Sequence, residues 1–399
     1  MKSSAQQIRS YKGPAILSFG FRPFFLVAGT WTVLSLALST AMLANLLMLP
    51  IAFEKVDWHV HEQLYGYLPA VIAGFMLTAV PNWTGRLPVT GMPLLSLVLV
   101  WLIGRLAMCK SAFLGVMPTA FLDVSFLLYF AFVIGREVVS GKNWKNLKVL
   151  ILIGVMAAGN AIFHYEAAEF GVAANGYGVR IGLAVAITLI MVIGGRIVPS
   201  FTRNWLARRV SESQLPVPFN RFDIIAMVIG VAALIVWCFL PFHEATAYLC
   251  VVAGGVQALR LARWAGHLTL SEPLVLVLHV GYAFVPLGFV LIGLASLLPY
   301  SITPNAAVHA WTAGAVGVMT LAVMTRASLG HSGKPLTANF TTTCAYSLIV
   351  LATLLRVASG IADAPDWSIE LAAAAWVMGF GLFLTNYGPL LVRSRSAQV

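Results

Sequence analysis

The chain has 399 residues, of which 60% are hydrophobic and only 10% are charged, and its mean hydropathy is +0.88. This composition excludes a soluble globular domain, because such domains carry a larger charged fraction. The formal net charge of +11 is spread over the segments between apolar stretches, which is typical of membrane proteins and argues against nucleic acid as a partner.

Apolar stretches recur along the whole chain, and each can cross a hydrocarbon core, which needs about 20 helical residues. The sequence predicts an all-α, polytopic transmembrane bundle of about twelve helices. We expect an N-terminal segment over 1–25, a single transmembrane helical domain over 26–391 and a tail over 392–399. The predicted spans are 26–49, 62–80, 94–109, 118–135, 148–164, 177–198, 222–241, 246–263, 273–298, 305–325, 339–357 and 368–391.

The basic residues indicate an orientation. With both termini in the cytoplasm, most of the Lys and Arg side chains fall on that side, including Lys142 and Arg209. The outer connections carry acids instead, such as Asp57. This bias follows the positive-inside rule and predicts a multi-pass protein with both termini cytoplasmic.

Two similar strings suggest internal repetition. Val80–Thr84 closes the second predicted span, Val198–Thr202 closes the sixth, and Val323–Arg326 is a weaker counterpart at the end of the tenth. This spacing favours three repeats of four helices, an organisation that membrane proteins use around a central site. Helix-terminating proline also occurs for local reasons, so both interpretations stay open.

Four histidines from three predicted helices lie at one membrane depth. His59 and His61 open the second helix, His164 closes the fifth and His309 opens the tenth. Imidazole is the usual ligand of haem iron, copper and zinc, and each residue alone is also compatible with an interfacial hydrogen bond. Because the side chains of residues two apart point about 200° apart on a helix, we expect His59 and His61 to have different partners. The hypothesis is that His61 and His309 face a haem, while His59 and His164 bind a second metal.

Carboxylates beside these histidines are candidates for proton delivery, which catalysis in a low-dielectric region requires. Glu62 is the first candidate catalytic residue and Glu166 the second. The alternative for Glu62 is that it only orients His59 as a hydrogen-bond acceptor. Asp123 lies within a helix and is either part of a proton path or hydrogen-bonded to Ser125 or a neighbouring helix.

Further haem-binding candidates lie toward the other side. His279 has apolar neighbours within the ninth helix, and either ligation or packing explains it. His331 lies in a predicted loop and is a candidate contact for a propionate. Arginine binds carboxylates bidentately, although arginine at this boundary is also what the topology demands. The arginines proposed as propionate partners are Arg86, Arg203 and Arg326.

Several long strings resemble the NnrS family, and together they extend from about residue 15 to 390. The matching strings are Gly20–Phe25, Trp58–Glu62, Ala73–Gly85, Gly194–Asn204 and His309–Gly333. The resemblance implies a bacterial inner-membrane protein that contains haem and copper and acts in the response to nitric oxide. The resemblance extends to the candidate residues: His59, His61, Glu62, His309 and His331 fall in these strings, and His164 and His279 fall within the stretch of the chain that the resemblance covers.

The resemblance therefore implies haem b and copper as cofactors and nitric oxide as the small-molecule partner. If the protein is an oxidoreductase that reduces nitric oxide to nitrous oxide, a quinol or a small redox protein must supply electrons, because the chain carries no C-x-x-C-H or iron–sulfur motif. Membrane lipid is the only other partner expected. The alternatives are a haem-based sensor without turnover and a secondary transporter.

Overall fold

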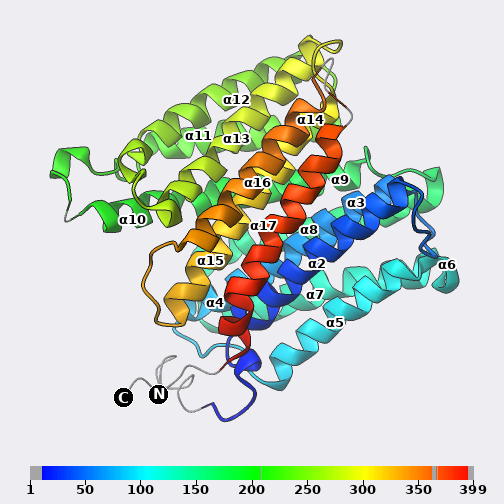
Figure 1. Ribbon diagram of the computed structural model, residues 1–399, viewed down its shortest axis with the longest axis horizontal. Helices are drawn as coiled ribbons and strands as arrows, with labels where there is room; N and C mark the ends of the chain where they lie inside the picture. Colours follow the sequence, from blue (N-terminus) through cyan, green and yellow to red (C-terminus); the bar gives the residue numbers. More distant parts are fainter. Residues whose placement is uncertain (1–10, 208, 362–364, 366, 394–399) are drawn as a thin grey trace. The chain divides into compact units, whose positions relative to one another are not determined.

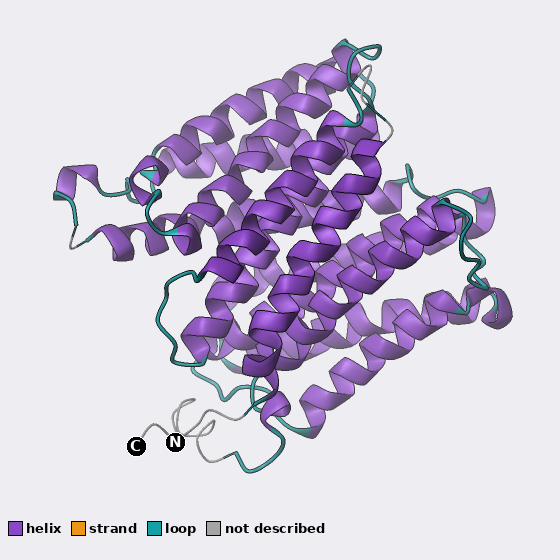
Figure 2. Ribbon diagram, in the orientation of Figure 1, coloured by secondary structure: helices purple, strands orange, loops and turns teal. Residues whose placement is uncertain are grey.

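A computed structural model describes residues 11–207, 209–361, 365 and 367–393 of the chain (Figure 1). Helices dominate these residues, and the described part contains no strand beyond an isolated bridge between Ile302 and Ile361 (Figure 2). Twelve helical segments in it are long and apolar enough to cross a membrane. The prediction of an all-α, polytopic bundle is thereby confirmed. Most of the predicted segment 1–25 and of the tail 392–399 lies outside the described residues.

The chain forms two compact units that interleave in sequence. Unit 1 contains the described parts of Met1–Gly182, Ala327–Lys334 and Phe383–Val399, and unit 2 contains Leu183–Arg326 and the described part of Pro335–Leu382. The single transmembrane domain over 26–391 stays a prediction.

In unit 1, neighbouring spans pack as antiparallel pairs, and α5 and α7 lie side by side (Figure 1). The left-handed glycines Gly85 and Gly171 end α4 and α8 as C-caps. The elements that lie in or begin in this unit are η1 (Ala15–Leu17), α2 (Phe21–Leu43), α3 (Lys55–His61), η2 (Glu62–Tyr67), α4 (Leu68–Thr84), α5 (Met92–Cys109), α6 (Ser111–Leu114), α7 (Val116–Ser140), η3 (Trp144–Asn146), α8 (Leu147–Phe170) and α9 (Tyr177–Leu189).

In unit 2, α12 packs against both α11 and α13. Asn220 caps α11 in a capping box with Asp223, and Thr303 caps α14. The remaining elements are η4 (Ile190–Gly194), α10 (Gly195–Leu206), η5 (Glu212–Gln214), α11 (Arg221–Phe239), α12 (Glu244–Ala262), η6 (Gly266–Thr269), α13 (Pro273–Leu297), α14 (Pro304–His309), η7 (Ala310–Val318), α15 (Met319–His331), α16 (Phe340–Ala358) and α17 (Trp367–Val392). Of these, α15 and α17 end in unit 1.

Within the part of the chain that the structure describes, three spans contain a π-helical segment, namely η2, η4 and η7. These are the second, sixth and tenth spans along the chain, so the irregularity recurs every four helices, at the interval of the predicted repeat. Each π-helical segment changes the phase of its helix and leaves backbone groups available, which is why such segments are frequent at functional sites.

The predicted ends of the second and sixth spans were too early. Pro81 and Pro199 lie inside α4 and α10, which continue to Thr84 and Leu206. Membrane helices tolerate proline when neighbouring groups satisfy the freed backbone carbonyls. The shared strings therefore mark a feature within the helices rather than their termination.

Candidate metal centre

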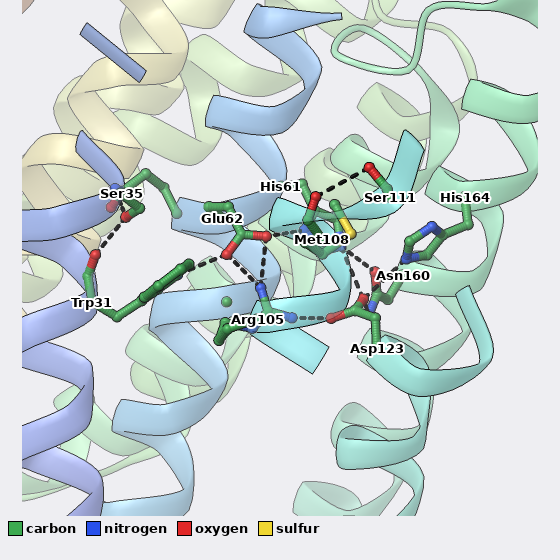
Figure 3. A network of polar contacts seen from close by, with 12 residues as sticks. Trp31, Ser35, His61, Glu62, Arg105, Met108, Ser111, Asp123, Asn160 and His164 are labelled. Carbon is green, nitrogen blue, oxygen red and sulfur yellow. Dashed lines mark hydrogen bonds and ion pairs between the residues drawn. The ribbon is translucent and has the colours of Figure 1, made fainter. Parts of the chain in front are cut away.

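Unit 1 encloses a network of polar side chains drawn from four consecutive spans (Figure 3). Its members are His61 and Glu62 at the junction of α3 and η2, Arg105 of α5, Asp123 of α7, and Asn160 and His164 of α8. The exposed fraction of each side chain is 2% or less. Burying ionisable groups at membrane depth costs free energy unless they are compensated, so this network is a candidate functional site.

Asp123 lies at the centre of the network. Its Oδ2 is 3.0 Å from His61 Nε2 and 3.0 Å from His164 Nε2, and it accepts a hydrogen bond from Asn160 Nδ2 at 2.7 Å. Its Oδ1 forms an ion pair with Arg105 Nη2. A neighbouring helix, and not Ser125, is therefore the partner of this carboxylate, because Ser125 donates to the Leu122 carbonyl instead.

Glu62 occupies the other side of Arg105. Both of its carboxylate oxygens accept from Arg105 Nη1 at 2.7 Å, and Oε2 also accepts from the indole of Trp31 at 2.7 Å. Oε1 lies 2.9 Å from His61 Nδ1. The expectation that Glu62 orients His59 was wrong, since the histidine that it contacts is His61.

The backbone explains this difference. η2 begins at Glu62, and a π turn contains more residues than an α turn, so the angle between neighbouring side chains narrows. Gly66 makes room for the guanidinium, because a Cβ there would lie 2.5 Å from Arg105 Nη1 and 2.9 Å from Glu62 Oε2. Sequence reasoning assumed a regular helical periodicity, which placed Glu62 on the face of His59 and away from His61.

His61, Asp123 and His164 form a possible metal site. Their ligand atoms all lie within 4.8 Å of one another. Two ligand atoms that are each about 2.1 Å from a metal lie about 3 Å apart when the bonds meet at about 90°, and both histidines are 3.0 Å from Asp123 Oδ2. Two imidazoles and one carboxylate form a donor set that suits copper, zinc or iron.

Two further observations favour a cation at this position. Nδ1 of His61 faces Glu62, and Nε2 faces oxygens of Asp123 and Asn160, each at 3.0 Å. An imidazole between acceptors on both sides needs a proton or a metal ion on Nε2. In addition, the carboxylates of Glu62 and Asp123 together face the single guanidinium of Arg105. One additional positive charge would neutralise the network.

His59 and His309 do not join this cluster. His59 is half-buried, and its Nδ1 lies 3.1 Å from Ser39 Oγ of α2. The two neighbouring histidines therefore have different partners, as expected, although His59 is not brought to His164. His309 belongs to unit 2, so the pairing of His61 and His309 on one haem stays a prediction.

Two histidines of unit 2 have a ring tautomer that is fixed by a hydrogen bond. His309 Nδ1 donates to the Asn305 carbonyl at 2.7 Å, which fixes the tautomer whose lone pair is on Nε2. His279 Nε2 lies 2.7 Å from Thr202 Oγ1, whose hydroxyl donates to the Val198 carbonyl, so Nε2 is the donor. The remaining lone pair of His279 is on Nδ1, which is buried and has no hydrogen-bond partner among the described residues.

The other predicted residues lie elsewhere. His331 is the last residue of α15 rather than a loop residue, and its ring contacts Phe19 and Phe21 at centroid distances of 5.3 and 5.5 Å. The guanidinium of Arg326 stacks over Phe201, with its central carbon 3.9 Å from the centroid of the ring. Two further arginines complete the predicted set: Arg86 is paired with Glu137 at 2.5 Å, and Arg203 is half-buried.

Glu166, the second candidate catalytic residue, has a structural role. Its carboxylate accepts from the backbone N–H groups of Tyr177 at 2.6 Å and Gly178 at 3.0 Å. These are orphan donors at the start of α9, so Glu166 caps that helix from outside. The interpretation of Glu166 as the second catalytic candidate stays a prediction, and these contacts give the carboxylate a structural role in addition.

Sequence reasoning missed Arg105 and Asn160. A signal for Arg105 was present, because it is the one charged residue in the predicted span 94–109, and an ionisable residue within a span marks a functional site by default. Asn160 carries no comparable signal, since a lone amide in a helix often serves packing between helices.

The fold and this site define a polytopic membrane protein with a buried cluster of histidine and carboxylate side chains that could hold a metal ion. The sequence model described as NnrS protein matches residues 15–395, nearly the whole chain, so the protein belongs to the NnrS family. Membership suggests a membrane protein of the nitric oxide response. No curated protein was similar enough to be matched to the chain.

Proposed function

We propose that the protein is a bacterial inner-membrane metalloprotein that handles nitric oxide, with copper at His61, Asp123 and His164 and haem b held by histidines of unit 2. The observation that carries the proposal is the convergence of His61 and His164 on one oxygen of Asp123, each at 3.0 Å, in a fully buried site. Family membership supports the assignment to the nitric oxide response.

The net charge of the network favours copper among the metals that the donor set accepts. A monovalent ion balances the excess carboxylate, and Cu(I) is the monovalent ion that imidazole binds well. When bound, copper would supply a redox-active centre at which nitric oxide can be held. Nitric oxide is small and apolar, so it dissolves in the membrane and reaches a buried site without a polar channel.

The residues of the chain orient the ligands and exclude water. Glu62 holds His61 through Nδ1, a contact that fixes the ring so that Nε2 faces Asp123. Phe163 is fully buried beside the cluster, and the centroid of its ring is 5.0 Å from that of His61. Such apolar walls strengthen the electrostatic interactions inside the site.

Reduction of nitric oxide to nitrous oxide would also need protons and electrons. Glu62 is not among the proposed copper ligands, and its Oε1 lies 2.9 Å from His61 Nδ1, so this carboxylate can hold a proton directly beside the site. Glu62 is the proton-delivering residue in this proposal. Electrons would come from a quinol or a small redox protein in the membrane or at its surface.

Haem binding is proposed for unit 2. His309 and His279 each present a ring nitrogen with a lone pair, and the tautomer is set by a hydrogen bond from the other nitrogen. This is the arrangement of metal-ligating histidine. For both, the axial role is a proposal, as are the contacts of propionates with Arg203 and Arg326. The propionate contacts of His331 and Arg86, which belong to unit 1, stay predictions.

Cofactor content tests the proposal directly. Protein purified in detergent from cells supplied with copper and a haem precursor should show a Soret band and near-stoichiometric copper by mass spectrometry. His61→Ala and His164→Ala should each lower copper content at least about tenfold, whereas His59→Ala is the matched control and should retain it. Full copper in both cluster variants would contradict the copper assignment.

Turnover distinguishes an enzyme from a sensor. Consumption of nitric oxide by the reduced protein, followed with an electrode, supports reduction. Spectral changes on nitric oxide binding without consumption support a sensor. Absence of both haem and copper in well-folded protein would favour the transporter interpretation.

A further inference from the structure

Unit 2 contains a second buried polar network. The side chain of Arg260 in α12 is fully buried, and its Nε donates to Asp223 Oδ1 of α11 at 3.0 Å. Its Nη1 donates to the Met191 carbonyl at 3.1 Å and to the Tyr282 hydroxyl at 2.9 Å. That hydroxyl donates in turn to Gln257 Oε1 at 2.8 Å. The network fixes the guanidinium in one orientation beside η4.

One nitrogen of this guanidinium is unused. Arg260 Nη2 has no hydrogen-bond partner among the residues that the structure describes, although the side chain is fully buried. Nη2 packs against Gly195, where a Cβ would lie 2.2 Å from it. Leaving a buried charged donor unpaired costs free energy, and the missing side chain at Gly195 is what lets Nη2 occupy this position.

The charges in contact with this network do not balance. Asp223 faces Arg260 at 3.0 Å and Arg263 at 3.9 Å. Its second oxygen also accepts from the backbone N–H of Asn220 at the start of α11. Two guanidinium groups therefore share one carboxylate. Arg260 is buried in the last turn of α12, and Arg263 follows the end of that helix and is partly exposed, so the excess positive charge that an anion would compensate lies at the end of the span.

The two units differ in the sign of this imbalance. In unit 1, the ion pair of Arg105 and Asp123 lies beside η2 and is joined by a second carboxylate, that of Glu62. In unit 2, the ion pair of Arg260 and Asp223 lies beside η4 and is joined by a second guanidinium, that of Arg263. The excess charge in unit 1 suits a cation, and the excess in unit 2 suits an anion. An uncharged carbonyl ligand would satisfy Nη2 and leave the charge unbalanced.

We propose that Arg260 Nη2 binds an oxygen of a monovalent oxyanion or carboxylate. Two sources share this chemistry. One is a free anion such as nitrite or formate, and the other is a propionate of haem, a source that rests on the proposed function. In both, Asp223 and Tyr282 hold the guanidinium in place while Nη2 donates to the ligand.

The test begins with purified protein in detergent, titrated with sodium formate or sodium nitrite at constant ionic strength kept with sodium chloride. A site gives a saturable rise in the unfolding temperature, because a ligand that binds only the folded state stabilises it. Haem content is measured on every sample. The absence of a saturable rise in haem-free protein overturns the proposal.

Charge variants separate the site from general electrostatics. Arg263→Gln should weaken formate binding about tenfold, which corresponds to about 1.4 kcal/mol. Arg209→Gln is the matched control, because it removes the same charge from an exposed position of unit 2. Equal affinities in the wild type and both variants, or equal weakening in both variants, overturn the proposal.

A steric variant gives an independent check. Gly195→Ala places a methyl group against Nη2 and should abolish the saturable shift, while Gly255→Ala, where a Cβ meets nothing within 4 Å, should leave it unchanged. Size-exclusion chromatography establishes that each variant is folded. If Gly195→Ala fails to fold, the charge variants alone decide. Wild-type affinity in a folded Gly195→Ala protein contradicts the proposal.

Haem content distinguishes the two sources. If the ligand is a free anion, haem-loaded and haem-free protein bind formate equally, and Arg263→Gln retains haem. If it is a propionate, formate binds only haem-free protein, and Arg263→Gln loses haem. Formate binding by a protein that never acquires haem would contradict the proposed haem function and leave this site established.

Discussion

His61 and His164 contact the same carboxylate oxygen, Oδ2 of Asp123, each through Nε2 at 3.0 Å. The two imidazoles come from different spans, and their ring centroids are 5.2 Å apart. A carboxylate between two imidazole nitrogens is costly to bury without a cation. Whether this oxygen binds a metal ion is therefore the first question to test in unit 1.

Asp123→Asn should lower copper content at least about tenfold, as loss of a ligand or its close support does. The amide preserves shape but removes the charge that pairs with Arg105. We also expect the free energy of unfolding to fall by about 1–3 kcal/mol, because a buried charged hydrogen bond is lost. Copper analysis and thermal unfolding of the purified variant measure both effects, and unchanged copper would exclude Asp123 as a ligand.

Glu62→Gln should leave the haem spectrum nearly intact and slow reductant-driven loss of nitric oxide by about 10²–10⁴-fold, the usual contribution of a proton-transferring residue. Glu166→Gln is the control, since Glu166 contacts backbone N–H groups of α9. That variant should reduce stability by about 1 kcal/mol, as for loss of a helix cap, and retain turnover. Equal rates in the wild type and Glu62→Gln would remove Glu62 from the proton path.

Gly66→Ala should destabilise the protein by about 1–3 kcal/mol through overpacking, because the new methyl group would meet Arg105 and Glu62. Gly154→Ala provides the comparison: no heavy atom lies within 4 Å of its Cβ, and alanine favours helix over glycine by up to about 1 kcal/mol. The midpoint temperature of thermal unfolding should therefore fall in Gly66→Ala and not in Gly154→Ala. Equal midpoints would show that η2 can move to admit a side chain.

Reporter fusions test the orientation. Fusions after Lys142 and after Arg209 should both report the cytoplasm, and a fusion after Asp57 should report the outer side, because positive charge is retained inside. Each fusion is made with two reporters that are active on opposite sides of the membrane, so that either location gives a measurable activity. An outer location for Arg209 would reverse the membrane side of His59, His61 and every other candidate.

Hydropathy predicted the twelve spans because length and apolarity follow from the thickness of the bilayer. The prediction that four histidines lie at one membrane depth also placed His61 and His164 near each other, although it assigned His61 to a haem and His164 to a second metal. The predicted direction of the side chains around the helix axis was wrong. A period of 3.6 residues placed Glu62 on the face of His59, whereas the helix becomes a π helix at Glu62 and Glu62 contacts His61. Arg105 was overlooked because arginine was read as a marker of topology, whereas its contacts are all inside the network.

The π segment η2 gives the copper-site proposal an unusual vulnerability. A π turn holds one residue more than an α turn over nearly the same rotation, so deleting one residue of η2 would restore an α-helix and leave the helix on either side almost in phase. A deletion of Gly66 would still take away the residue whose missing side chain makes room for the guanidinium of Arg105. Every side chain of the network would remain in the chain, yet the guanidinium would lose the space in which it contacts Glu62. The spacing of residues within one helical turn, as much as composition, is what unit 1 must preserve.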